Sequence, residues 1–132
     1  MYTSKAYVYL RFYGEDFRPI ELTSLINIDP TSYGQKGQRG QYGVYKECFW
    51  QKKLKKTSAL DELDDSILKL ISIFKDKIPS IKDFMKKHNV KAKYFVVIKA
   101  KNNEDVGVCM GIDVIRFLNE LGASVEVDVY NC

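Results

Sequence analysis

Four segments of the chain alternate apolar and polar side chains with the two-residue period of a β-strand. The first covers residues 6–13, and one of its faces would join a core: Ala6, Val8, Leu10 and Phe12. Its other face is amphipathic: Tyr7, Tyr9, Arg11 and Tyr13. Similar alternation covers residues 44–54, 91–101 and 124–130, the last with Val125, Val127 and Val129 on one face. These segments predict a sheet with one buried side.

Helical segments separate the predicted strands. Pro19 suits the first turn of a short helix that Asn27 can end. Residues 57–78 have the strongest helical periodicity, with apolar residues at intervals of three and four: Leu60, Leu63, Ile67, Leu70, Ile71, Phe74 and Ile78. Pro79 should break or kink this helix before a second piece that runs to Asn89.

A final helix is expected within residues 106–122, with Gly122 as its C-terminal stop. Its predicted buried stripe is Ile112, Ile115, Leu118 and Leu121. The order of elements indicates an α+β fold in which one sheet of about four or five strands is covered by helices on one face. A chain of 132 residues is the size of one domain, residues 1–132.

The chain also contains a weak internal echo. An alternating strand, a turn with Glu-Asp and a short helix occur in both halves, with Glu15-Asp16 in the first and Glu104-Asp105 in the second. A ferredoxin-like pseudo-repeat (βαβ-α-βαβ) would explain the echo, and chance similarity would explain it equally well.

Composition and charge limit the classes of function. No apolar run approaches the roughly 18 residues that a membrane span needs, and no secretion signal precedes the first strand, so a cytoplasmic location is expected. Cys48, Cys109 and Cys132 have no metal-ligand spacing, so neither a disulfide framework nor a zinc site is predicted. Residues 36–56 and 67–101 are basic, whereas residues 57–66 and 102–132 are acidic.

Catalytic groups are few. His88 is the only histidine, which excludes schemes that need two imidazoles. Glu126 and Asp128 share one face of the last strand, but alternation along a half-exposed strand predicts the same acids without any chemistry. The chain is therefore expected not to be an enzyme and to need neither a cofactor nor a metal.

Residues 33–43 place a glycine at every third position, which raises the question of a phosphate-binding loop. These glycines lead into a strand, and the Gly-Lys-Ser/Thr ending of the common phosphate loop is absent. Two readings stay open. The stretch is a mobile hairpin loop, or it is a basic arm whose Lys36 and Arg39 meet phosphates while Tyr42 and Tyr45 stack on bases.

Several features resemble the bacterial family known as domain of unknown function 4279. These features are Lys36-Gly37 in the glycine-rich connection, Trp50 in the following strand, the long amphipathic helix, and the ending "FLNELGASVEVDVY" with Asp128 and Tyr130. The resemblance covers nearly the whole chain. It implies a small single-domain bacterial protein with no established activity.

The resulting interpretation is a non-enzymatic protein-binding module, with an antidote or immunity-type partner as one version. The alternative is a single-stranded nucleic-acid-binding protein that uses the basic arm and the tyrosines of the sheet. No membrane partner is expected, and the sequence does not set the oligomeric state. The candidate binding residues are Tyr7, Tyr9, Arg11, Tyr13, Lys36, Arg39, Tyr42, Tyr45, Trp50, Asp128 and Tyr130.

Overall fold

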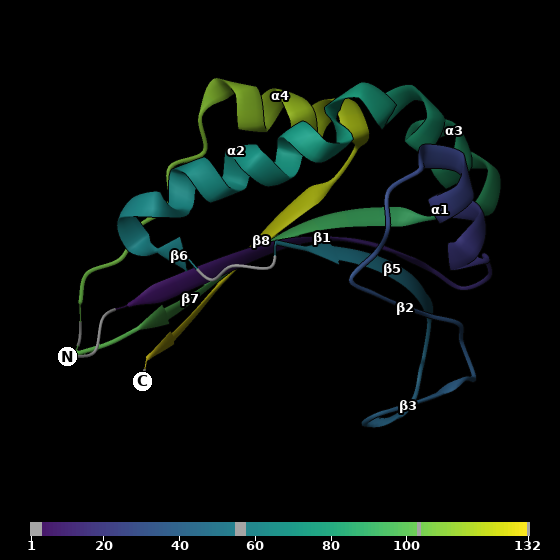
Figure 1. Ribbon diagram of the computed structural model, residues 1–132, viewed down its shortest axis with the longest axis horizontal. Helices are drawn as coiled ribbons and strands as arrows, with labels where there is room; N and C mark the ends of the chain where they lie inside the picture. Colours follow the sequence, from purple (N-terminus) through teal and green to yellow (C-terminus); the bar gives the residue numbers. More distant parts are fainter. Residues whose placement is uncertain (1–3, 55–57, 103, 132) are drawn as a thin grey trace.

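The computed structural model describes residues 4–54, 58–102 and 104–131. Its main sheet has the strand order β2-β5-β1-β7-β8, with β6 beside β1, and β3 and β4 form a separate two-stranded sheet (Figure 1). The strands are β1 (Lys5–Gly14), β2 (Ser32–Gly34), β3 (Arg39–Gly40), β4 (Gly43–Val44), β5 (Cys48–Lys53), β6 (Ser58–Ala59), β7 (Lys91–Ala100) and β8 (Ser124–Asn131). The α-helices are α1 (Pro19–Ile26), α2 (Leu63–Phe74), α3 (Ile78–His88) and α4 (Ile112–Leu121).

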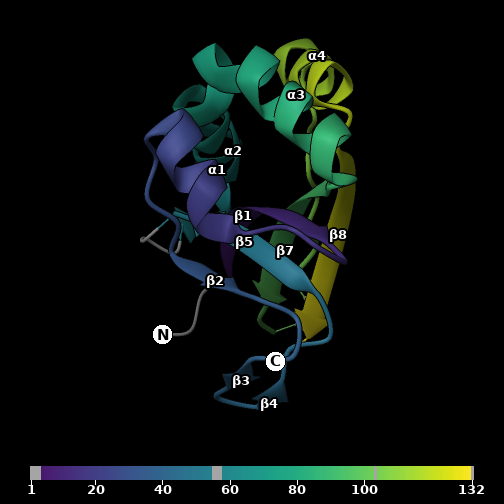
Figure 2. The same cartoon turned by 90° about the vertical axis from the view of Figure 1, so that its right-hand side faces the viewer.

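The four α-helices of the described residues lie on one face of the main sheet, and none of them lies on the opposite face (Figures 1 and 2). The predicted α+β class, with one sheet covered on one face, is confirmed. None of the described helices has the length and apolar character that a membrane crossing requires.

The core lies between the helices and the sheet. Alternation along β1 buries one face completely, since Val8, Leu10 and Phe12 are all 0% exposed. Two polar groups in this layer are satisfied by hydrogen bonds. Trp50 Nε1 donates to Thr23 Oγ1 at 2.9 Å, and the Tyr94 hydroxyl donates to the Ile67 carbonyl oxygen at 2.9 Å.

The predicted helix ends at Asn27, Asn89 and Gly122 are confirmed, because each residue adopts the left-handed conformation after its helix. The predicted long helix is also interrupted near Pro79. The short 3₁₀ turn Lys75–Lys77 separates α2 from α3, and Pro79 lies in the first turn of α3, where a missing backbone N–H costs little. Residue 57, the first of the predicted segment, lies outside the described residues, and the next two, Ser58–Ala59, form the short strand β6 and not a helix.

The prediction for the last helix was partly wrong. α4 begins at Ile112, after an extended approach, and Leu118 and Leu121 are buried as expected. Ile112 and Ile115, however, are 72% and 54% exposed. The buried arc is instead completed by Val114 and Phe117, because α4 is rotated so that its Phe117 side packs onto α2 and α3.

The pseudo-repeat is not found, because the two halves of the sheet pair differently. β1 pairs antiparallel with β5 and with β7, whereas β7 pairs parallel with β8 through the α4 crossover. A duplicated unit would give the same pairing in both halves. The Glu-Asp echo therefore does not reflect a ferredoxin-like duplication.

The last strand lies at the edge of the sheet. Its valines occupy the helix-side face, since Val127 pairs with Val96, which in turn pairs with Val8. Val8 and Val96 are fully buried, but Val125, Val127 and Val129 are 43%, 43% and 47% exposed. The helix layer thus covers the centre of the sheet and leaves this edge partly open.

Candidate functional site

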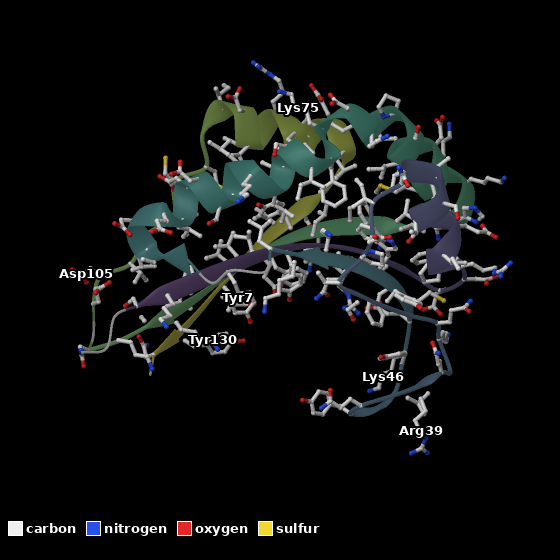
Figure 3. The ribbon with its side chains drawn as sticks, viewed as in Figure 1. Tyr7, Arg39, Lys46, Lys75, Asp105 and Tyr130 are labelled. Carbon is white, nitrogen blue, oxygen red and sulfur yellow. The ribbon has the colours of Figure 1, made fainter. Side chains whose placement is uncertain are left out.

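The face of the main sheet opposite the helices, here called the open face, gathers side chains from four strands. Cross-strand pairing places Tyr9 beside Lys53 and Phe95, and Arg11 beside Gln51 and Lys93. Figure 3 shows Tyr7 and Tyr130 on this side of the sheet. The open face consists of Tyr7, Tyr9, Arg11, Tyr13, Phe49, Gln51, Lys53, Lys91, Lys93, Phe95, Val97, Lys99, Glu126, Asp128 and Tyr130.

Three rings form a stacked cluster at the centre of the open face. Tyr9 and Phe95 stack with centroids 4.4 Å apart and an interplanar angle of 12°. Tyr7 continues the stack, 6.3 Å from Tyr9 at 18°. Partial burial, together with the nearby Tyr7, raises the pKa of Tyr9 above its ordinary value of 10.0, so its hydroxyl stays protonated at neutral pH. The cluster offers a continuous stacked aromatic surface.

Cations lie over two aromatic rings of the open face, Tyr7 of the cluster and Phe49 of β5. Lys53 Nζ is 4.0 Å from the Tyr7 ring centroid, and Lys99 Nζ is 5.8 Å from the same centroid. Arg11 Cζ lies 4.2 Å from the Phe49 centroid. Such contacts orient the cations along the sheet surface and contribute about 0.5–1 kcal/mol each at exposed sites.

Some of these cations already have acidic partners. Arg11 donates to Gln51 Oε1 at 3.1 Å and to Glu47 Oε1 at 3.2 Å, so its guanidinium is held in place and partly neutralised. Lys93 Nζ lies 3.5 Å from Glu126 Oε1. Within the described residues, Lys53 and Lys99 have no ion-pair partner. Together with the exposed Lys91, which also has no ion-pair partner among the described residues, these two lysines are the open-face cations that a ligand can reach without breaking an ion pair.

The glycine-rich stretch forms an ordered hairpin that projects on the same side as the open face (Figures 1 and 2). The Gly37 N–H donates to the Tyr45 carbonyl oxygen, and the Tyr45 N–H donates to the Gln38 carbonyl oxygen, each at 2.9 Å. Gly40 has no room for a side chain, because a Cβ there would lie 2.5 Å from the Tyr45 ring. The hairpin reading is confirmed by strands β3 and β4, whereas the mobility of the loop stays a prediction.

The base of the hairpin is joined to the turn after β1. Lys36 Nζ forms an ion pair with Glu15, whose hydrogen bond raises the pKa of Lys36. The charge of Lys36 is thereby neutralised, which weakens its predicted role as a phosphate ligand. Arg39, by contrast, has no ion-pair partner in the described part of the chain. Tyr42, at the tip, is 96% exposed.

The predicted site residues fall into three groups. Tyr7, Tyr9, Arg11, Tyr13, Asp128 and Tyr130 lie together on the open face, and Lys36, Arg39, Tyr42 and Tyr45 belong to the hairpin. Trp50 is a correction, because its side chain is 0% exposed and packs edge-on against Phe12 and Phe74 in the core. It cannot contact a partner directly.

Sequence reasoning missed the contribution of β7 to the open face. Phe95, Lys93 and Lys99 alternate with fully buried neighbours such as Tyr94. The alternation within "KAKYFVVIKA" was the available signal, but neighbouring Tyr94 and Phe95 are both aromatic and do not reveal which face is buried. The register with β1 settles the choice by placing Phe95 against Tyr9.

The metal-ligating side chains of the described residues do not gather in one place. No group of three His, Cys, Asp or Glu side chains that could hold a metal occurs in residues 4–54, 58–102 and 104–131. His88 packs against the Phe84 ring at 4.5 Å and lies 4.0 Å from Glu21. Two hollows of about 320 and 360 Å³ lie in the helix layer, the first between α2 and α4 and the second between α1 and α3.

Comparison with known proteins identifies a family. The family model described as "Domain of unknown function (DUF4279)" matches residues 4–132. Neither the comparison with curated proteins nor the comparison with solved structures found a match. The open face and hairpin therefore sit on a chain that belongs to the domain of unknown function 4279 family.

Proposed function

We propose that this protein is a non-enzymatic protein-binding module and that the open face is its ligand surface. The observation that carries this proposal is the stacked cluster of Tyr7, Tyr9 and Phe95, which is flanked by Lys53 and Lys99. Aromatic side chains and arginine are enriched in the energetically dominant positions of protein interfaces. Because these rings are already stacked, little side-chain entropy is lost when a partner covers them.

The charges of the open face indicate the chemistry of the partner. Lys53 and Lys99 can meet carboxylates, while the exposed edges of the rings can meet apolar side chains. The partner that fits best is a protein surface with acidic groups around an apolar centre. A toxin held by an antidote is one version of this proposal, and a toxin gene next to the gene for this protein would support that version.

Single-stranded nucleic acid is a second candidate, favoured by the hairpin. Arg39 and Lys46 project below the sheet on the side of the tyrosines, as Figure 3 shows. These two cations could contact the phosphates of a single strand while its bases stack on the nearby tyrosines. Against it, Arg11 is committed to Glu47, Tyr9 and Phe95 stack on each other, and Glu126 and Asp128 would repel phosphates. We therefore place protein first.

Photocrosslinking in cells tests both candidates. A benzoylphenylalanine replaces Tyr7 in one variant and Lys82, an exposed residue of α3, in a matched control. We expect a discrete adduct from position 7 that protease removes and nuclease does not, and no such adduct from position 82. Adding Lys53→Glu and Lys99→Glu should reduce the yield of the adduct at least tenfold, because both cations face the partner.

Two outcomes would contradict the protein-binding proposal. A nuclease-sensitive adduct from position 7 would establish the nucleic-acid alternative instead. Adducts from position 82 alone, with position 7 silent, would place the ligand on the helix layer and overturn the role of the open face.

A further inference from the structure

The outer edge of β8 is an unpaired strand edge. β8 is eight residues long and is the last strand in the sheet order, so no strand of the described residues pairs with its outer side. An edge of this kind presents a row of free backbone N–H and C=O groups that can pair with another extended segment. Natural edges are often protected by lysine or proline, and β8 contains neither. Its backbone is therefore open to strand addition.

The helix-side face of β8 adds an apolar strip to this edge. Val125, Val127 and Val129 keep nearly half of their surface exposed. Ile115 of α4, 54% exposed, lies on the flank of the helix away from α2, since the α2-facing hollow is lined by Asp113, Arg116 and Glu120. In Figure 2, α4 lies above β8, and α2 lies to the left of α4. An added strand could cover the exposed parts of the β8 valines with aliphatic side chains of its own.

The open-face side of β8 carries negative charge. Glu126 and Asp128 alternate with the valines and are half-buried. Lys93 of the neighbouring strand already approaches Glu126 to 3.5 Å, which shows that this carboxylate accepts a lysine from an adjacent strand. Asp128 has no ion-pair partner within the described residues. An added strand therefore meets acids on one face and valines on the other.

This charge pattern disfavours a second copy of the chain as the occupant. A two-fold antiparallel pairing centred on Val127 would set Glu126 of each copy opposite Asp128 of the other. Centring the pairing on Asp128 would instead set the two Asp128 carboxylates opposite each other. Like charges directly opposite destabilise a strand pair. In these two registers, which pair the most residues of β8, like charges oppose a second copy, whereas a basic strand meets only opposite charges.

We propose that β8 binds an extended basic segment by strand addition, with lysine or arginine alternating with β-branched aliphatic residues. The basic side chains lie opposite Glu126 and Asp128, and the aliphatic side chains cover Val125, Val127 and Val129. Backbone hydrogen bonds supply affinity, while the alternation supplies specificity. This site shares Glu126 and Asp128 with the border of the open face, but it binds through the backbone edge of β8, away from the aromatic cluster of Tyr7, Tyr9 and Phe95, and attracts a partner of the opposite charge.

A labelled heptapeptide, acetyl-Lys-Val-Lys-Val-Lys-Val-Lys-amide, serves as the probe in fluorescence anisotropy with the full chain. We expect salt-sensitive binding that weakens about tenfold in the Glu126→Gln/Asp128→Asn variant, because two cross-strand charge pairs are lost. The matched control is Asp76→Asn/Asp83→Asn, which makes the same charge change on exposed positions of the helix layer. This control should bind within twofold of the unmodified chain. Equal urea midpoints would show that both variants are folded.

A second peptide separates strand addition from simple charge attraction. It has the same sequence with N-methyl groups on alternate residues, which removes the backbone N–H groups of one edge and keeps the charge. We expect it to bind at least tenfold more weakly, and we expect alternate β8 amides to exchange at least tenfold more slowly when the unmethylated peptide is bound.

Four results would overturn the proposal. They are no binding of the unmethylated peptide at low salt, equal binding of both peptides, equal weakening in the helix-layer control, and sedimentation showing that the chain alone dimerises through β8. Failure here leaves the crosslinking result at position 7 unaffected, since that experiment probes the aromatic cluster around Tyr7 in β1 and not the backbone edge of β8.

Discussion

The central strand β1 and the edge strand β8 carry the same alternation but have opposite surroundings. Val8 in β1, Val96 in β7 and Val127 in β8 lie in one row across the helix-side face. Val8 and Val96 are 0% exposed, whereas Val127 is 43% exposed. The three side chains are chemically identical and point to the same face. Their burial differs only because helices cover the centre of the sheet and not its edge.

This contrast shows what a two-residue period can predict. The period assigns each side chain to one of two faces, since successive residues of a strand point to opposite sides. It does not say how far the covering layer extends. In a central strand the whole apolar face is buried and stabilises the core, while in an edge strand part of the apolar face stays exposed and can contact a partner. β8 is accordingly the strand that can gain most from a partner.

The largest expected effect compares one substitution at the two ends of the row. Val8→Ala should lower the free energy of unfolding by about 2 kcal/mol, because two buried methyl groups are lost and a cavity remains. Val127→Ala should lower it by about 0.5 kcal/mol, because its methyl groups are already partly hydrated. Urea unfolding of both variants measures the difference. Equal losses would show that the edge is covered in solution and would break the comparison.

A smaller effect concerns the polar group in the covered layer. Tyr94, in β7, is fully buried, and its hydroxyl bonds to the Ile67 carbonyl oxygen. Tyr94→Phe should lower the free energy of unfolding by about 1 kcal/mol at pH 8, because the carbonyl loses a buried donor.

The same variant predicts a pH dependence. Burial raises the pKa of Tyr94 above its ordinary value of 10.0, so the folded state holds this proton more tightly than the unfolded state. The contribution of the protonated Tyr94 to the free energy of unfolding is complete below pH 10. It is lost as the pH rises further, by about 1.4 kcal/mol per pH unit. The gap between the unmodified chain and Tyr94→Phe should therefore shrink above pH 10. Tyr42→Phe, at a position that is 96% exposed, makes the same chemical change at the surface and serves as the control.

The smallest expected effect concerns the ion pair that joins β7, inside the sheet, to the edge strand β8. Lys93→Met removes the ion pair between Lys93 and Glu126. The Lys93 side chain is 30% exposed and the Glu126 side chain is 43% exposed. It should cost less than about 1 kcal/mol, and the loss should fade in 1 M salt because exposed pairs are screened. A double-mutant cycle with Glu126→Gln measures the pair. A coupling that persists in high salt would mean that the edge is drier than its exposure indicates.

Strong local signals accounted for most of the fold. The helix ends at Asn27, Asn89 and Gly122 were predictable because each residue tolerates the left-handed conformation that ends a helix. The interruption near Pro79 followed from the missing backbone N–H of proline. Pairing was not predictable in the same way, since the parallel β7–β8 and antiparallel β1–β5 contacts depend on residues far apart in the chain.

The candidate site was predictable only in part. The tyrosines of β1 were assigned to one face from their spacing, and the structure confirms that face. Trp50 was misassigned, since a tryptophan in a strand suits an interface as well as a core. The role of Phe95 required the register with β1, which places its ring on Tyr9.

By itself, the sequence determined the order of the main helices and strands, the two faces of β1 and the residues that end the helices, because these follow from periodicity and from the backbone preferences of single residues. The tertiary structure alone decided which strand became an edge, how the helix layer was placed, and which side chains met on the open face. These features depend on the competition among many distant contacts for the same buried surface, and no local pattern encodes its outcome.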